Sequence, residues 1–211
     1  MSALPRNLIQ GFQRFREQHF ERNDNLYQQL VKQGQTPKIL VVACCDSRVD
    51  PALVFDCDPG DLFVIRNVAN LVPPLEVQSG RHGTTAAIEY GVSTLGVKHI
   101  IVLGHARCGG INALVRTGGV CASGSYIDDW MCLVESARAE VMAEMPQAPL
   151  AEKERACEQR AILVSLNNLM TFPWIHERVE QGILRLHGWY FDIEHGQLLN
   201  YDTTARVFKP L

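Results

Sequence analysis

The chain has 211 residues, of which 46% are hydrophobic and 20% are charged, so its composition is that of a globular protein and excludes a disordered one. The formal net charge of −3 lacks the basic surplus typical of nucleic-acid-binding proteins. No apolar run reaches the roughly 18 residues needed to span a bilayer, and the N-terminus lacks the apolar core of a secretion signal. We therefore expect a cytoplasmic protein with no membrane partner and no nucleic-acid partner.

The seven cysteines are an odd number in a chain without a secretion signal, which is a poor basis for a disulfide framework. We expect reduced thiols instead. Most of them should be small buried side chains, and some should be metal ligands.

A helical arm opens the chain. Leu8, Phe12 and Phe15 lie on one face of a helical stretch over residues 7–32, and the other face is polar. Such a stripe must be buried either on the chain's own domain or on a partner chain. We expect residues 1–34 to form a protruding arm and residues 35–211 to form a single α/β domain.

Short apolar runs then alternate with helical stretches, a pattern that predicts an α/β fold. The central β-sheet is expected to be mostly parallel, to contain four to five strands and to be flanked by helices. The expected strands cover residues 38–43, 62–65, 99–103, 188–193 and, at an edge, 198–201, and the expected helices cover 84–95, 128–145, 152–170 and 173–181.

Two groups of polar residues directly follow expected strands. The segment CCDSR at 44–48 follows the first strand, and GHARCGG at 104–110 follows the third. Ligands of an open parallel sheet bind beyond the carboxyl ends of its strands, so the two segments can converge. Two thiolates and one imidazole suit zinc, and three protein ligands leave the fourth position open for water, as in catalytic zinc sites. Extended backbone sends Cys44 and Cys45 to opposite sides, so this argument leaves open which of them faces the metal.

Taken one at a time, these residues have simpler explanations. A lone cysteine is usually a buried thiol, His105 can be a polar residue at a strand end, and Asp46 with Arg48 can be a surface ion pair of little energetic value. A redox role for the adjacent cysteines is less favoured, because redox pairs usually have the Cys-x-x-Cys spacing.

The combined pattern resembles the signature of the β-class carbonic anhydrases, and in particular their plant-like branch with an open site. The likeness rests on C-x-D-S-R at 44–48, on H-x-x-C at 105–108 and on the flanking segment 54–74. It implies a carbonate dehydratase, a zinc lyase in which zinc-bound hydroxide attacks carbon dioxide to give bicarbonate and a proton. It also implies that one Zn²⁺ per chain is bound by Cys44, His105 and Cys108.

The resemblance assigns further roles around the metal. Asp46, paired with Arg48, orients the hydroxide, and once freed from Arg48 it can ligate zinc and block the site. The plant-like branch places a Gln, a Phe and a Tyr around the metal, where a glycine lets the backbone approach closely. Their simpler alternatives are a turn residue, a strand-core residue and a helix-packing residue. The expected substrate-binding residues in this chain are Gln35, Phe63, Tyr90 and Gly109.

A second branch of the family has an inhibitory bicarbonate site that uses a Trp three residues before the first cysteine ligand. Val41 occupies that position here, and Arg66, which matches an arginine of that site, is not sufficient alone. The resemblance therefore implies an active site that stays open near neutral pH.

In the family the N-terminal arm wraps a neighbouring chain, which implies a homodimer or a dimer of dimers. Gln35 beside the zinc of one subunit would then be complemented by Phe63 and Tyr90 of the other. Two alternative functions remain open: a carbon disulfide or carbonyl sulfide hydrolase of the same fold, and a non-catalytic zinc-binding interaction protein. The second of these predicts loss of the pair Asp46 and Arg48, which this sequence retains.

Overall fold

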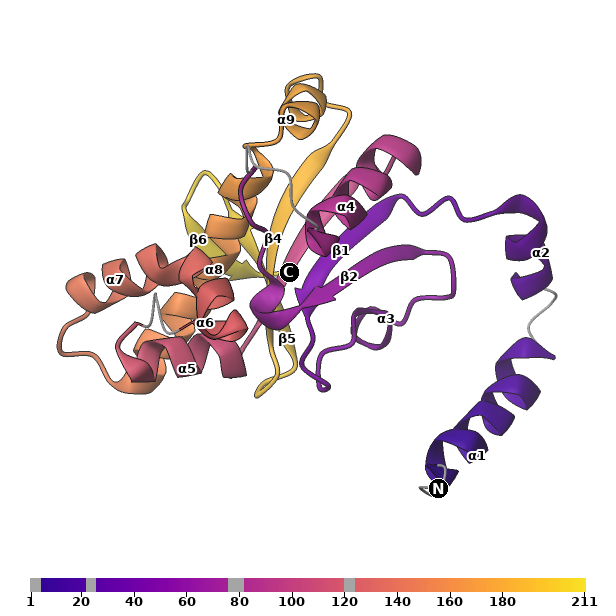
Figure 1. The fold of residues 1–211 in the computed structure, drawn as a ribbon, viewed down its shortest axis with the longest axis horizontal. Coiled ribbons are helices and arrows are strands. Elements are labelled where there is room, and N and C mark those ends of the chain that lie inside the picture. Colours follow the sequence, from indigo (N-terminus) through magenta and orange to yellow (C-terminus); the bar gives the residue numbers. More distant parts are fainter. Residues whose placement is uncertain (1–4, 22–25, 76–81, 120–123) are drawn as a thin grey trace.

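Six strands form one sheet at the centre of the chain. A computed structural model describes residues 5–21, 26–75, 82–119 and 124–211 (Figure 1). The strand order is β2-β1-β3-β4-β5-β6, and the strands from β2 to β4 in that order are parallel, whereas β5 and β6 are added antiparallel. The strands are β1 (Ile39–Cys44), β2 (Leu62–Asn67), β3 (His99–His105), β4 (Arg185–Asp192), β5 (Gln197–Asp202) and β6 (Val207–Pro210).

The predicted mostly parallel α/β sheet is confirmed, but it has one strand more than expected. The addition, β6, has four residues, three of which are exposed, so it lacks the apolar run that marks a buried strand. It forms because a tight turn brings it back onto β5, with the Asp202 carboxylate accepting the backbone N–H groups of Thr204 and Ala205.

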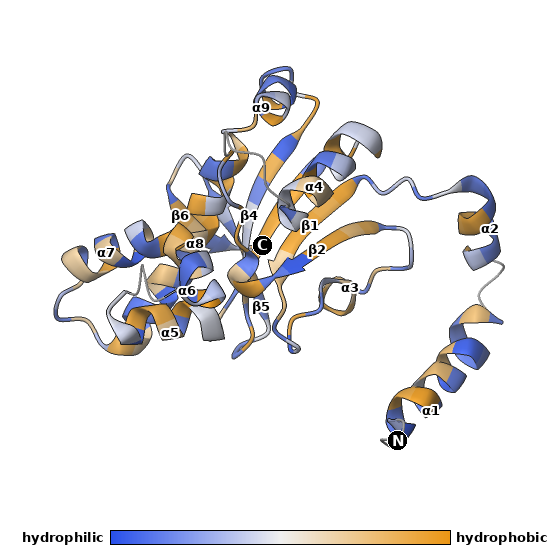
Figure 2. Cartoon of the chain, viewed as in Figure 1, coloured by the Kyte–Doolittle hydropathy of each residue, from blue (hydrophilic) through white to orange (hydrophobic). Residues whose placement is uncertain are grey.

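The central strands are the most apolar part of the molecule, as the colouring of Figure 2 shows. From Leu40 to Cys44 every residue of β1 is buried, because β1 lies between β2 and β3 with side chains packed on both faces. On one face, Leu40 and Val42 of β1 join Ile100 of β3 and residues of α8 in the largest apolar cluster. This packing fixes where the carboxyl ends of β1 and β3 lie.

Helices cover the sheet and its carboxyl edge. The four expected helical stretches are present, one of them interrupted, and helices over 51–54 and 109–117 are added. The expected single helix over 128–145 is interrupted by a 3₁₀ turn at Cys132–Val134. The tighter turn keeps Met131, Val134 and Ala137 on one buried face, since 3₁₀ geometry aligns residues three apart. The helices are α3 (Pro51–Val54), α4 (Gly83–Glu89) continued by a π-helical stretch (Tyr90–Thr94), α5 (Gly109–Thr117), α6 (Tyr126–Met131), α7 (Glu135–Glu144), α8 (Leu150–Leu169) and α9 (Pro173–Glu180).

The N-terminal arm extends away from the sheet (Figure 1). It consists of α1 (Arg6–Phe15), a π-helical stretch (Arg16–Phe20) and α2 (Leu26–Gln33), and none of these residues is buried. Aromatic contacts of Tyr27 with Phe15 and Phe20 hold the two parts of the arm together. Leu8 and Phe12 of the apolar stripe are therefore left exposed by the described residues of the chain.

The expectation of reduced thiols is wrong at one position. Cys132, in the 3₁₀ turn after α6, is disulfide-bonded. The described cysteines with free thiols are Cys44, Cys45, Cys57, Cys108 and Cys157. Within the described parts of the chain, no helix combines the length and the apolar character that a membrane crossing requires.

Candidate metal centre

The three expected metal ligands meet at one edge of the sheet. Cys44 is the last residue of β1 and His105 the last residue of β3, and these parallel neighbours end side by side. Cys108 directly precedes α5. The three ligand atoms lie within 4.8 Å of one another, and all three residues are buried.

The ring of His105 is oriented as a metal ligand. Its Nδ1 lies 2.9 Å from the carbonyl oxygen of Ala106. A carbonyl only accepts hydrogen bonds, so Nδ1 carries the proton and Nε2 keeps a free lone pair. That Nε2 is buried without a hydrogen-bond partner among the described residues. A buried lone pair beside two thiols is what a zinc ion would satisfy.

The two cysteine sulfurs also fit one zinc ion. Their Sγ atoms are 4.0 Å apart, and two sulfurs bound tetrahedrally at ~2.3 Å from zinc lie about 3.8 Å apart. The hydrogen bond between the two sulfurs lowers the pKa of Cys44. The same contact, with burial, raises the pKa of Cys108. A bound Zn²⁺ would replace the shared proton and hold both side chains as thiolates.

Cys45 points elsewhere. It is exposed, whereas Cys44 is buried among the ligands. Of the two adjacent cysteines, which extended backbone directs to opposite sides, Cys44 is therefore the one that faces the other candidate ligands.

Glu158 of α8 supports the ligand loop and was not predicted from the sequence. Its carboxylate accepts the backbone N–H of Cys108 at 2.9 Å and the hydroxyl of Tyr190 at 2.7 Å. Burial raises the pKa of Glu158. The signal available in the sequence was an acidic residue on the buried face of a helix, which is uncommon unless the charge has partners.

Asp46 and Arg48 form a pair beside the ligands. The Arg48 Nε donates to Asp46 Oδ1 at 2.9 Å and the Arg48 Nη2 donates to Asp46 Oδ2 at 2.6 Å, a two-point contact. The backbone N–H of Arg48 also donates to Asp46 Oδ1 at 2.9 Å. These hydrogen bonds hold the pKa of Asp46 well below its usual range. The carboxylate is therefore ionised and directed toward Arg48.

Arg66 of β2 fixes the backbone of the same loop. Its Nε donates to the carbonyl oxygen of Cys44 at 2.9 Å, and its Nη2 donates to the carbonyl oxygen of Asp46 at 2.7 Å. Its Nη1 pairs with Asp50, the residue that caps α3. In this chain the guanidinium is thus occupied by structural contacts.

The expected substrate-binding residues lie in two places. Gly109 lies next to Cys108, at the start of α5. Phe63 pairs with Leu40 in the sheet, four positions before the pairing of Asn67 with Cys44, which is ~13 Å along the strands.

Tyr90 and Gln35 lie near the same distant end of the sheet. The ring of Tyr90 is 5.9 Å from that of Phe63, and Tyr90 is 46% exposed. Gln35 is exposed in the segment before β1 begins at Ile39. Gln35 therefore precedes the start of β1, whereas Cys44 is the last residue of that strand.

Comparison with known families identifies related proteins. The family profile described as carbonic anhydrase matches residues 39–198. A carbonic anhydrase of Synechocystis sp. is 39% identical over 201 residues, covering 95% of this chain and 72% of the relative. The chloroplastic β carbonic anhydrase 5 of Arabidopsis thaliana is 45% identical over 159 residues, covering 75% of this chain and 52% of the relative.

Solved structures give the same result. The β-carbonic anhydrase CcaA superposes with a TM-score of 0.90 at 38% identity, covering 98% of this chain and 91% of that chain. One of two tetrameric β-carbonic anhydrases of the ascomycete Sordaria macrospora superposes with a TM-score of 0.76 at 31% identity, covering 92% of each chain.

Proposed function

The chain belongs to the β-class carbonic anhydrases, and on that premise we propose how its residues divide the work. It catalyses the reversible hydration of carbon dioxide to bicarbonate and a proton, with zinc as its metal. The roles proposed below rest on one observation. Three buried candidate ligands lie together, next to the ionised Asp46, which is bound by Arg48.

We propose Cys44, His105 and Cys108 as the zinc ligands. Zinc held there would supply a water that ionises readily, with a pKa of about 7 in the three-histidine carbonic anhydrases. Two thiolates donate more charge than neutral imidazoles, so the water bound here is expected to be less acidic. The ring of His105, held through Nδ1, presents Nε2 in a fixed orientation.

Asp46 and Arg48 are the proposed catalytic pair. Because Arg48 keeps Asp46 ionised, the carboxylate can accept a hydrogen bond from the reacting water and orient it toward carbon dioxide. As long as both carboxylate oxygens contact Arg48, Asp46 is kept from the metal as a fourth ligand. The pair would therefore control whether the site is open.

Substrate enclosure is proposed to need a second chain. Gly109 belongs to the chain's own ligand loop, whereas Gln35, Phe63 and Tyr90 lie near the other end of β1. We place these three residues of one subunit against the metal of its partner, which revises the division expected for Gln35. An uncovered apolar stripe on α1 provides a surface for the contact. Residues 1–34 would act as an arm on a homodimer, and pairs of dimers would give a tetramer such as those of Sordaria macrospora.

A cytoplasmic location is part of the same proposal and rests on the mostly free thiols. Hydrolysis of carbon disulfide or carbonyl sulfide is not favoured, since the relatives named above are carbonic anhydrases.

Stopped-flow measurement of carbon dioxide hydration, with metal analysis of the same sample, tests the function. One zinc per chain and rapid hydration that a chelator abolishes are expected. A zinc-loaded protein that hydrolyses carbonyl sulfide but does not hydrate carbon dioxide would contradict the proposal.

A further inference from the structure

Arg107 lies between two proposed zinc ligands in a conformation that arginine rarely adopts. Its φ is 59°, in the left-handed region that favours glycine. Such backbone strain persists only where surrounding contacts enforce it, and it is found most often at functional sites. The contacts of this residue show what enforces it here.

The side chain of Arg107 is anchored on the far side of the ligand loop. Its Nε and Nη2 donate to Glu194 Oε1 at 3.2 and 3.0 Å, and its Nη1 lies 3.8 Å from Glu154 Oε2. Glu194 follows β4, and its backbone N–H donates to the buried Asp192 at 3.0 Å. Glu154 is 2% exposed and is also bound by Arg116 at 2.6 Å. The carboxylate of Glu154 is therefore held by a second arginine, and the backbone that carries Glu194 is fixed by Asp192.

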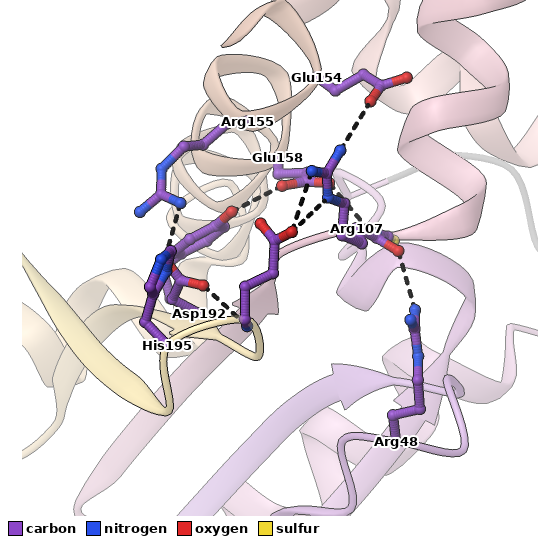
Figure 3. A network of polar contacts seen from close by, with 10 residues as sticks. Arg48, Arg107, Glu154, Arg155, Glu158, Asp192 and His195 are labelled. Atoms are coloured by element: carbon purple, nitrogen blue, oxygen red, sulfur yellow. Dashed lines mark hydrogen bonds and ion pairs between the residues drawn. The ribbon is translucent and has the colours of Figure 1, made fainter. Parts of the chain in front are cut away.

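The backbone of Arg107 contacts the catalytic pair. Its carbonyl oxygen accepts a hydrogen bond from Arg48 Nη2 at 3.0 Å. The same Nη2 donates to Asp46, so one nitrogen joins the carboxylate to the carbonyl. Figure 3 shows Arg48 reaching toward Arg107, and Arg107 reaching in turn toward the network around Glu154 and Asp192. The side chain of Arg48 is 52% exposed, so it depends on such contacts for a fixed position.

We propose that Arg107 and Glu194 are positioning residues: their ion pair holds the strained peptide whose carbonyl keeps Arg48 turned toward Asp46. Weakening the ion pair lets the loop relax, frees Arg48 and releases Asp46 toward the metal. This inference rests on the role proposed above for Asp46 and Arg48. It explains why arginine, and not glycine, occupies a left-handed position: glycine would adopt the conformation without strain but would provide no anchor.

The first test is Glu194→Gln, with Glu144→Gln as a matched control. Glu144 is also an exposed carboxylate bound by an arginine, Arg160, but on the distant helix pair α7 and α8. We expect Glu194→Gln to keep its zinc and to lose about three- to tenfold in kcat/KM, the effect of one weakened hydrogen bond to a charged group. The control should match the wild type. Wild-type activity in Glu194→Gln would overturn the proposal.

A spectroscopic measurement separates positioning from a general structural role. The visible absorption of the Co²⁺-substituted protein reports the ligands of the metal, and Arg48→Ala gives the reference spectrum for a released Asp46. We expect Glu194→Gln to shift partly toward that reference. A loss of activity with an unchanged Co²⁺ spectrum would contradict the proposal.

The direction in which activity changes distinguishes a positioning role from a direct electrostatic effect on the metal. Arg107→Ala removes a positive charge and Glu194→Gln removes a negative one, so a field effect on the metal would move activity in opposite directions. Positioning requires both variants to lose activity. Opposite signs would overturn the proposal.

A double-mutant cycle identifies the route. If Arg107 acts through Arg48, Arg107→Ala should have little further effect in an Arg48→Ala background. Additive losses would overturn the inference and leave the function of the pair intact. Full activity of Arg48→Ala alone would instead contradict the role of the pair proposed above.

Discussion

The residues at the two ends of β1 differ in how far a single chain buries them and brings them together. At the carboxyl end, Cys44 meets His105 and Cys108 within a single chain, and all three are buried. At the amino end, Gln35 and Tyr90 are exposed, and none of the residues of α1 is buried. The three candidate metal ligands are therefore brought together by the fold of one chain, whereas we propose that the wall around the substrate is completed by assembly. Variants at each end of β1 test this contrast, and a variant away from both ends gives the smallest effect.

The largest effect is expected from a change at the carboxyl end. Cys108→Ser should lose most of its zinc and more than about 100-fold in hydration rate, because the hydroxyl is a poor ligand and support by Glu158 cannot replace a thiolate. Cys45→Ser is the control, since its thiol is exposed and points away. Metal analysis and stopped-flow kinetics on both proteins provide the measurement. Full zinc in Cys108→Ser would show that the ligand set is wrong.

The catalytic pair should lose rate without losing metal. Asp46→Asn keeps the shape of the side chain but not its charge, and we expect hydration to fall by about 100- to 1,000-fold, the range of lost acid–base assistance. Zinc content should stay near one per chain, because Asp46 is held by Arg48 and not by the metal. Asp202→Asn, at the distant β5–β6 turn, serves as control. Wild-type turnover in Asp46→Asn would remove the pair from the mechanism.

Changes near the amino end of β1 should reduce activity by preventing the association of chains. Deletion of residues 1–34 is expected to give single chains that hydrate carbon dioxide at least about tenfold more slowly, because their pockets lack the partner's residues. Light scattering behind a sizing column and stopped-flow kinetics measure both quantities.

A single substitution in α1 tests the same association with a smaller change to the chain. Phe12→Asp places a charge in the exposed stripe of α1, where Phe12 is 64% exposed, and should weaken association. Gln10→Ala, a polar residue of the same helix, should not. A fully active single chain would show that the site is complete without a partner.

The smallest effect concerns acid stability away from both ends. Burial of Asp192 raises its pKa, but hydrogen bonds from Arg155 and His195 outweigh burial and lower it to about 2. Because the folded pKa is depressed, the stabilisation is present above the unfolded pKa and is lost as pH falls through about 2. We expect the difference in unfolding free energy between wild type and Asp192→Asn to narrow by about 1 kcal/mol from pH 5 to pH 3. Urea titrations measure it, and a constant difference would contradict the shift.

The parts that sequence predicts are those set by local rules. Strand ends place Cys44 and His105 at one edge regardless of the distance between them in the chain. The role of Glu158 and the conformation of Arg107 depend on contacts between residues far apart in the chain, such as Glu158 with Cys108, 50 positions away, and no local pattern encodes them.

The strand order also determines when the protein can first hold its metal. Cys44 and His105 belong to β1 and β3, which are direct neighbours in the sheet although 61 positions separate these two residues in the chain. The other neighbour of β3 is β4, which begins only at Arg185, so a growing chain at the ribosome lacks this support until β4 has been made. Pairings of such long range are slow to form. The two strands that carry Cys44 and His105 are therefore supported on both sides only late in folding.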